Sequence, residues 1–180
     1  MDASVAAVMG AALGALGGLG GGWLTVFGQG RQQRGQREAE RERWRDELRR
    51  DAYNACIGSA KRLSASWWKF SDCLWKQDST TDEWRSAFAD AHDAWTEFSA
   101  DIAAVTIAGP RSVVEAADTL RQALYDLDVA GMEWFATALR EEHGRLDVHY
   151  RNFKQAAEAK RIPDRAFQKA AREALGTERP

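Results

Sequence analysis

The chain has 180 residues, with 25 Lys and Arg against 27 Asp and Glu and a formal net charge of −2. This length suits one ordinary domain plus a short extra segment and excludes two full domains. The near-zero charge, with basic residues spread over several segments, predicts no nucleic-acid partner, because such proteins gather Lys and Arg on one face.

The first feature along the chain is a run over residues 3–28 that contains no charged side chain. About 20 apolar residues suffice to cross a bilayer core, and a helix is the only single segment that satisfies its own backbone there. We therefore predict a glycine-rich transmembrane helix over residues 1–28. A cleaved signal peptide is disfavoured because Met1 and Asp2 provide no basic start.

Glycine recurs every fourth position within this run, as in a glycine zipper. A spacing of four places the glycines on one helix face, where a second helix can approach closely. The competing interpretation is that so glycine-rich a tract produces this spacing by chance. The zipper predicts a homo-oligomer, packed through Gly10, Gly14, Gly17, Gly18, Gly21 and Gly22.

Residues at the end of the apolar run predict how the chain lies in the membrane. Trp23 suits the headgroup level, and Arg31, Arg34 and Arg37 follow the run without an intervening acid. Because positively charged flanks stay in the cytoplasm, we expect a single-pass protein of the cell membrane. Its N-terminus is predicted outside and the bulk of the chain in the cytoplasm.

Residues 29–50 are almost entirely polar or charged, which predicts a charged helical stalk that continues the membrane helix. Pairs of opposite charge three or four residues apart support such a solvated helix. The remaining residues, 51–180, contain few helix breakers and are rich in good helix formers. They predict an antiparallel helical bundle, so the expected fold class is all-α.

Capping and stop signals set the expected helix bounds. Thr80 with Glu83 and Ser112 with Glu115 have the spacing of capping boxes. Gly109-Pro110 stops one helix, and His143-Gly144 is a plausible end of the next. Bundle helices are expected at about 31–77, 81–108, 112–142 and 146–175, with a break near 163.

Apolar residues recur at spacings of three and four in each expected helix, which is typical of bundles and coiled coils. Over 81–108 one series of apolar residues alternates spacings of four and three without interruption: Trp84, Phe88, Ala91, Trp95, Phe98, Ile102 and Val105. The following residues are predicted to form the bundle core: Trp67, Trp84, Phe88, Trp95, Phe98, Leu120, Leu124, Leu127 and Trp134.

No signature of catalysis, metal binding or a cofactor is found. His92, His143 and His149 lack the Glu three residues earlier that di-iron bundles use. Cys56 and Cys73 would lie about 25 Å apart in one helix, too far for a disulfide. We therefore expect no enzyme, no metal ligands and no cofactor.

The functional hypothesis is a non-enzymatic, membrane-tethered bundle that self-associates and binds an unidentified cytoplasmic protein. One alternative is a membrane-active effector that forms pores or acts like a holin. Another is a ligand-binding sensor that uses the tryptophan-rich core, which contains most of the eight tryptophans of the chain. Core packing accounts for those tryptophans more simply.

The stretches GGWLTVFGQGRQQR and RDAYNACIGSAKRLSASWW, joined by the Arg/Glu stalk, resemble uncharacterised single-span proteins from high-GC actinobacteria. The use of 19 Arg against 6 Lys is consistent with that origin. The resemblance covers the whole chain and implies a membrane-anchored helical protein, but it implies no activity.

Overall fold

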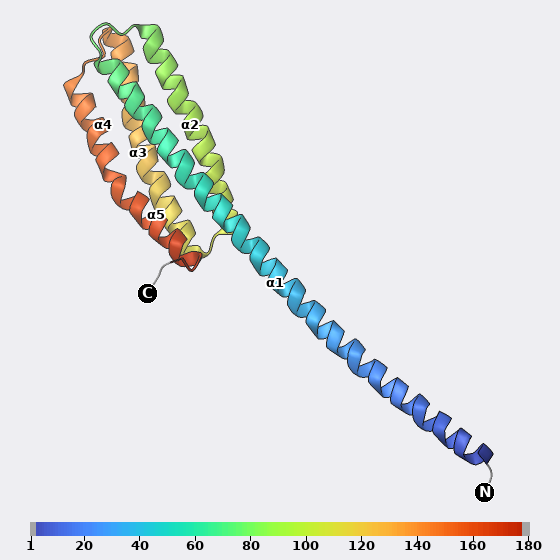
Figure 1. Ribbon diagram of the computed structural model, residues 1–180. Coiled ribbons are helices and arrows are strands. Elements are labelled where there is room, and N and C mark those ends of the chain that lie inside the picture. Colours follow the sequence, from blue (N-terminus) through green and yellow to red (C-terminus); the bar gives the residue numbers. More distant parts are fainter. Residues whose placement is uncertain (1–2, 178–180) are drawn as a thin grey trace. The chain divides into compact units, whose positions relative to one another are not determined.

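The computed structural model describes residues 3–177, with side chains for 37, 38 and 40–177. The predicted all-α class is confirmed for this part of the chain. The chain divides into two compact units, residues 1–45 and 46–180. The helices are α1 (Ala3–Trp75), α2 (Thr81–Ala108), α3 (Arg111–Glu141), α4 (Asp147–Ala159) and α5 (Arg161–Ala174) (Figure 1).

The first unit consists of the N-terminal part of α1. Its described side chains are exposed, including Trp44 at 64%. Acidic and basic residues alternate at spacings of three and four here, and such pairs favour a helix whose side chains face solvent.

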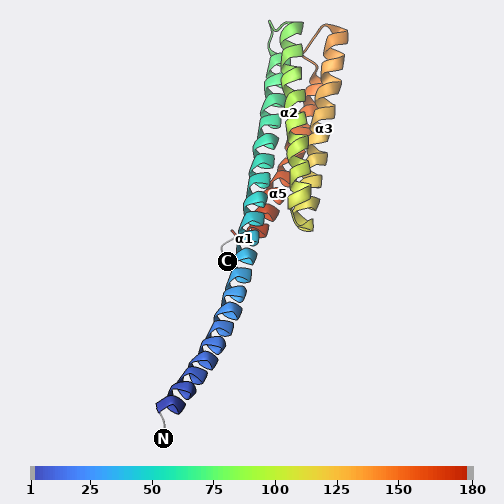
Figure 2. The same ribbon diagram turned by 90° about the vertical axis from the view of Figure 1, so that its right-hand side faces the viewer.

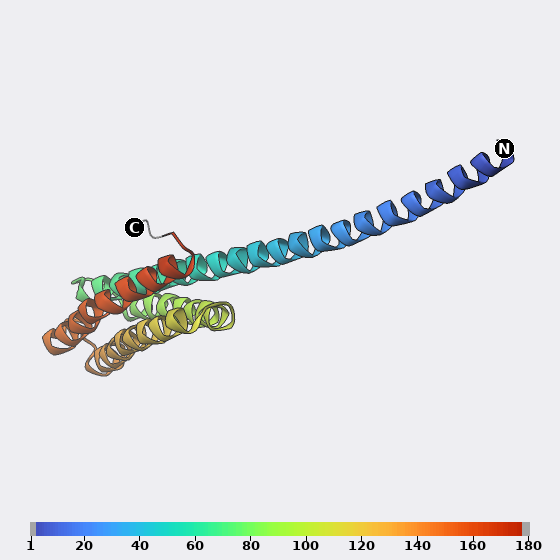
Figure 3. The same ribbon diagram turned by 90° about the horizontal axis from the view of Figure 1, so that it is seen from below.

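The second unit is a helical bundle, as predicted. The remaining part of α1 runs antiparallel to α2, and α2 runs antiparallel to α3, as the views in Figures 1 and 2 show. The helices α4 and α5 follow one another and together form the fourth layer of the bundle. Figure 3 shows α5 alongside α1, where Tyr53 and Phe167 meet edge to face with ring centroids 6.4 Å apart.

The start of α2 follows from local sequence. Thr80 accepts a hydrogen bond from the Glu83 backbone N–H, and the Glu83 carboxylate accepts one from the Thr80 backbone N–H at 2.7 Å. The predicted capping box is therefore confirmed. These contacts satisfy N–H groups that the first turn of a helix otherwise leaves unpaired. They also lower the pKa of the Glu83 carboxyl, with the Thr80 backbone as the largest cause.

The second predicted capping box, Ser112 with Glu115, is wrong. The N-cap of α3 is Pro110, and no side chain caps the helix. Because α3 begins at Arg111, Ser112 already lies inside the first turn. Glu115 instead accepts a hydrogen bond from Arg111 Nε at 2.7 Å.

The end of α3 also differs from the prediction. The C-cap is Glu142, which adopts the left-handed conformation with φ of 50°, rather than His143-Gly144. Gly144 is required for a different reason, since a Cβ there would overlap the Leu74 carbonyl. The Gly144 carbonyl in turn accepts a hydrogen bond of 2.8 Å from the buried Trp134 Nε1. This contact joins the α3–α4 turn to the core.

The break predicted near 163 lies at Lys160, which ends α4 and precedes α5. Lys160 keeps a right-handed helical conformation, with φ of −64° and ψ of −17°. The two helices therefore continue with little change of phase. Pro163 lies in the first turn of α5. Backbone N–H groups there have no acceptor within the helix, so the lack of one in proline costs no hydrogen bond.

Candidate functional site

The centre of the bundle is filled by aromatic rings from every layer. Trp67 of α1 lies 5.2 Å from Phe70 and 6.1 Å from Phe88 of α2, and Phe88 stacks on Phe135 of α3 at 4.3 Å between centroids. Phe153 of α4 completes the cluster at 6.4 Å from Trp67. Edge-to-face and offset pairs at these distances are favourable packing arrangements. The interior is therefore occupied by side chains of the protein itself.

Most of the predicted core residues are buried in this unit. Phe88 and Trp95 are half-buried and pack against the core from its edge. The remaining predicted core residues are each at most 5% exposed: Trp67, Trp84, Phe98, Leu120, Leu124, Leu127 and Trp134.

The tryptophans of the bundle contact different helices. Trp68 meets Phe153 of α4, whereas Trp95 meets Tyr125 of α3. Trp84 donates a hydrogen bond of 2.8 Å to Ser79 Oγ in the turn before α2. The indoles thus contribute to several separate seams between helices.

A polar group that the sequence analysis missed lies inside the bundle. Asp128 of α3 is only 6% exposed, and burial raises the pKa of its carboxyl. The charge of His92 and the indole of Trp67 oppose this rise. Trp67 Nε1 is buried without a partner in hydrogen-bonding geometry. The only indication in the sequence that Asp128 is buried was its position next to the core residue Leu127.

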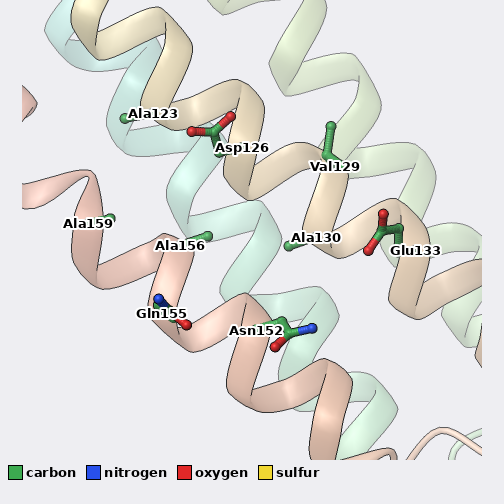
Figure 4. Close-up of a pocket in the computed structure, with 9 residues that line it drawn as sticks. All are labelled: Ala123, Asp126, Val129, Ala130, Glu133, Asn152, Gln155, Ala156 and Ala159. Carbon is green, nitrogen blue, oxygen red and sulfur yellow. The ribbon is translucent and has the colours of Figure 1, made fainter.

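A groove of about 370 Å³ runs between α3 and α4 on the surface of the bundle (Figure 4). Ala130 of α3 and Ala156 of α4 face the gap between the two helices. Its polar side chains come from both walls. The lining residues are Ala123, Asp126, Val129, Ala130 and Glu133 of α3 and Asn152, Gln155, Ala156 and Ala159 of α4.

The residues that line this groove are acidic rather than basic. Asp126 and Glu133 are its two carboxylates, and no Lys or Arg is among the residues that line it. Asp126 accepts a hydrogen bond of 2.9 Å from Gln122 of its own helix. Within the described residues, neither carboxylate forms an ion pair with α4.

The seam between α1 and α2 is closed in a different way. Arg62 donates two hydrogen bonds to Glu97, at 3.0 and 2.6 Å, and Lys69 pairs with Asp90 at 2.8 Å. These interactions raise the pKa of both basic groups, with the hydrogen bond to the acid as the largest cause. Glu97 and Asp90 therefore each have a cation across this seam.

The groove was not predicted because its lining residues give no strong periodic signal. Alanine and amide residues appear in the sequence as ordinary helix-surface positions. Their pairing across α3 and α4 depends on how two helices pack. The sequence signal that could have indicated this surface is the pair of apolar residues Val148 and Ile162. They are exposed and lie one turn before and one turn after the α4 residues that line the groove.

The residues predicted to act in the membrane fall on the first unit. The backbone of α1 includes these glycines, Gly10, Gly14, Gly17, Gly18, Gly21 and Gly22, but their surroundings and the side chains of Trp23, Arg31 and Arg34 lie outside the described part of the structure. Arg37 is described and exposed. Among the residues that the structure describes, no helix has the length and apolar character needed to cross a bilayer.

In the described part of the chain, no three His, Cys, Asp or Glu residues are placed to share a metal ion. Cys56 is fully buried and Cys73 is half-buried, and both are free thiols. Comparison with family models, curated proteins and solved structures finds no match for the chain.

Proposed function

We propose that this chain is a non-enzymatic, membrane-tethered helical-bundle protein that self-associates and binds another protein in the cytoplasm. The observation that carries the proposal is the contrast between a core filled by aromatic rings and an open groove on the bundle surface. A filled core suits a structural module rather than a small-molecule pocket. An open groove between two helices suits a protein partner.

The membrane part of the proposal rests on the sequence of residues 3–28. That run has no charged residue, and arginines follow it at 31, 34 and 37. The absence of charge over 26 residues and the basic flank together favour a single span with the bundle in the cytoplasm. The glycine spacing of four favours self-association within the membrane.

Self-association is tested by sizing the full chain in a mild detergent. Gly14→Leu with Gly18→Leu places bulky side chains on the glycine face, so the oligomer is expected to dissociate. Ala12→Leu is the matched control, because residue 12 lies on the opposite side of the same helix. An oligomer of unchanged size in the double variant would contradict self-association through this face.

Membrane attachment is tested separately by fractionating cells that express the full chain. The protein is expected in the membrane pellet after washing with alkaline carbonate, which removes peripheral proteins. Arg31→Glu with Arg34→Glu and Arg37→Glu should disturb its orientation, which protease protection of the bundle reports. Release of the unmodified chain by carbonate would contradict a spanning helix.

A further inference from the structure

The α3–α4 groove is bordered by one continuous face of the fourth layer. Val148, Asn152, Gln155, Ala159 and Ile162 follow one another at spacings of four, three, four and three. Such spacing keeps residues on one side of a helix, and the right-handed conformation at Lys160 preserves the phase into α5. From Val148 to Ile162 this face extends about 21 Å, or about four helical turns.

Both ends of this face are apolar and uncovered. Val148 is 57% exposed and Ile162 is 78% exposed. Between them the groove has alanines, which leave room for the backbone of another helix to come close. Helices pack with their axes about 8–10 Å apart, and the smallest side chains allow the shortest separations. The shape of this surface therefore fits a helix laid along the groove.

The electrostatic character of the groove selects among helical partners. On the α1–α2 seam, Arg62 and Lys69 neutralise the acids opposite them, at 2.6 and 2.8 Å. On the α3–α4 seam, Asp126 and Glu133 face the groove without a cation among its lining residues. Residues 80–142, which include α2 and α3, contain 4 Lys and Arg against 13 Asp and Glu. A partner with Lys or Arg beside its apolar face would supply the missing charge.

We propose that the groove binds a basic amphipathic helix of three to four turns from another protein. This inference rests on the proposed function, because it specifies the chemistry of the partner that the bundle binds. An apolar stripe of the partner contacts the alanines together with Val148 and Ile162. Its flanking Lys or Arg side chains pair with Asp126 and Glu133, and its polar groups meet Asn152 and Gln155.

The test uses the full chain in detergent micelles and a displayed library of 18-residue helical peptides. The peptides share an alanine and leucine stripe, while their flanking positions vary among Lys, Glu, Gln and Ser. Selection is expected to enrich Lys at the flanks. Enrichment of Glu, or no preference between Lys and Glu, would overturn the proposal.

Affinity of a selected peptide is then measured by fluorescence anisotropy against paired variants. Asp126→Lys with Glu133→Lys is expected to weaken binding about tenfold, and replacing Lys by Glu in the peptide should restore it. Asp72→Lys with Asp93→Lys changes two exposed acids elsewhere and should leave affinity unchanged. Equal affinity for the groove variant and this control would overturn the proposal.

A steric variant gives an independent measurement. Ala159 is exposed in the groove, so Ala159→Trp should fill it and abolish binding, whereas Ala89→Trp on α2 should not. Unfolding curves of the two double charge variants and the two tryptophan variants verify that each remains folded. Binding of the peptide to Ala159→Trp with wild-type affinity would contradict docking in the groove.

The groove could instead be filled by a second copy of this chain, and the experiments distinguish this outcome from binding of another protein. If Asp126→Lys with Glu133→Lys dissociates the oligomer and no peptide class is enriched, the groove is a contact between copies and the proposal fails. Repeating the binding measurement with Gly14→Leu and Gly18→Leu separates peptide binding in the groove from self-association through the glycine face. If the chain dissociates and still binds the peptide, the groove proposal is supported. If the wild-type chain forms an oligomer but binds no peptide, the groove proposal fails while self-association stands.

Discussion

The ring of Trp67 lies directly on the backbone of Gly131. A Cβ built on Gly131 would overlap Cε3, Cζ3 and Cη2 of that ring, so the helices α1 and α3 approach closely only because this residue is glycine. Both residues are buried, and Trp67 is 1% exposed. The relationship gives a steric reason for a glycine in the middle of a long helix, where it otherwise costs about 1 kcal/mol relative to alanine.

Gly131→Ala is therefore expected to destabilise the bundle by about 1–3 kcal/mol, the usual cost of overpacking. The measurement is urea unfolding followed by tryptophan fluorescence. Gly58→Ala is the matched control, since its Cβ would meet only the flexible end of Arg62, with Nη1 3.3 Å away. Its expected effect is a gain of up to about 1 kcal/mol from helix propensity. Equal stability changes in the two variants would contradict the close approach.

Thr80→Ala is expected to lower the free energy of unfolding by about 1 kcal/mol, because it removes the N-cap of α2. Ser112→Ala is expected to change it by no more than about 0.5 kcal/mol. Ser112 has the same apparent motif in the sequence, but Pro110 occupies the N-cap of α3. Thermal unfolding of both variants checks the pair, and a comparable loss in Ser112→Ala would contradict the assigned start of α3.

Asp128→Asn is expected to stabilise the bundle at neutral pH. Burial is the largest cause that raises the pKa of this carboxyl in the folded protein. The folded state then holds its proton more tightly than the unfolded state. The wild-type chain therefore loses stability as pH rises from the unfolded pKa to the folded pKa of Asp128. Above the folded pKa the whole destabilisation from the buried charge is present. Asparagine has nearly the same shape as aspartate but cannot ionise.

The check is chemical unfolding of the wild type and of Asp128→Asn at several pH values. The advantage of the variant should be greatest at neutral pH, should shrink as pH falls through the raised folded pKa, and should be lost below the unfolded pKa of aspartate. Asp126→Asn provides a control on an exposed carboxyl of the same helix. An advantage that is independent of pH would show that the buried charge is not its cause.

Cys56 is expected to resist modification by thiol reagents in the folded protein. Burial raises the pKa of its thiol to about 12, with smaller contributions from Asp101 and Asp164. The thiolate is the reactive form, so three pKa units reduce its population roughly a thousandfold. The measurement is the rate of reaction with Ellman's reagent in a Cys73→Ser variant. Rapid labelling without denaturant would contradict this burial, whereas labelling in urea is expected.

Local sequence was sufficient to predict much of the helical structure. Thr80 with Glu83 sets the start of α2, and Gly109-Pro110 sets its end, because both signals act within one turn of the chain. The apolar spacing over 81–108 likewise identified most of the buried face of α2, although Ala87 and Ala94 are buried where Phe88 and Trp95 are half-buried. These features depend on neighbours along the chain, so the sequence contains the information directly.

The tertiary structure decided the features that involve residues distant in the chain. Gly131 and Gly144 resemble ordinary helix breakers in the sequence, yet each is explained by contact with α1, through Trp67 and Leu74. The burial of Asp128 depends on the helices around α3. The groove beside Asp126 and Glu133 exists only because α4 packs against α3 through alanines. Helix formation is set within a turn or two, whereas pairing of helix faces is set by packing across the whole bundle.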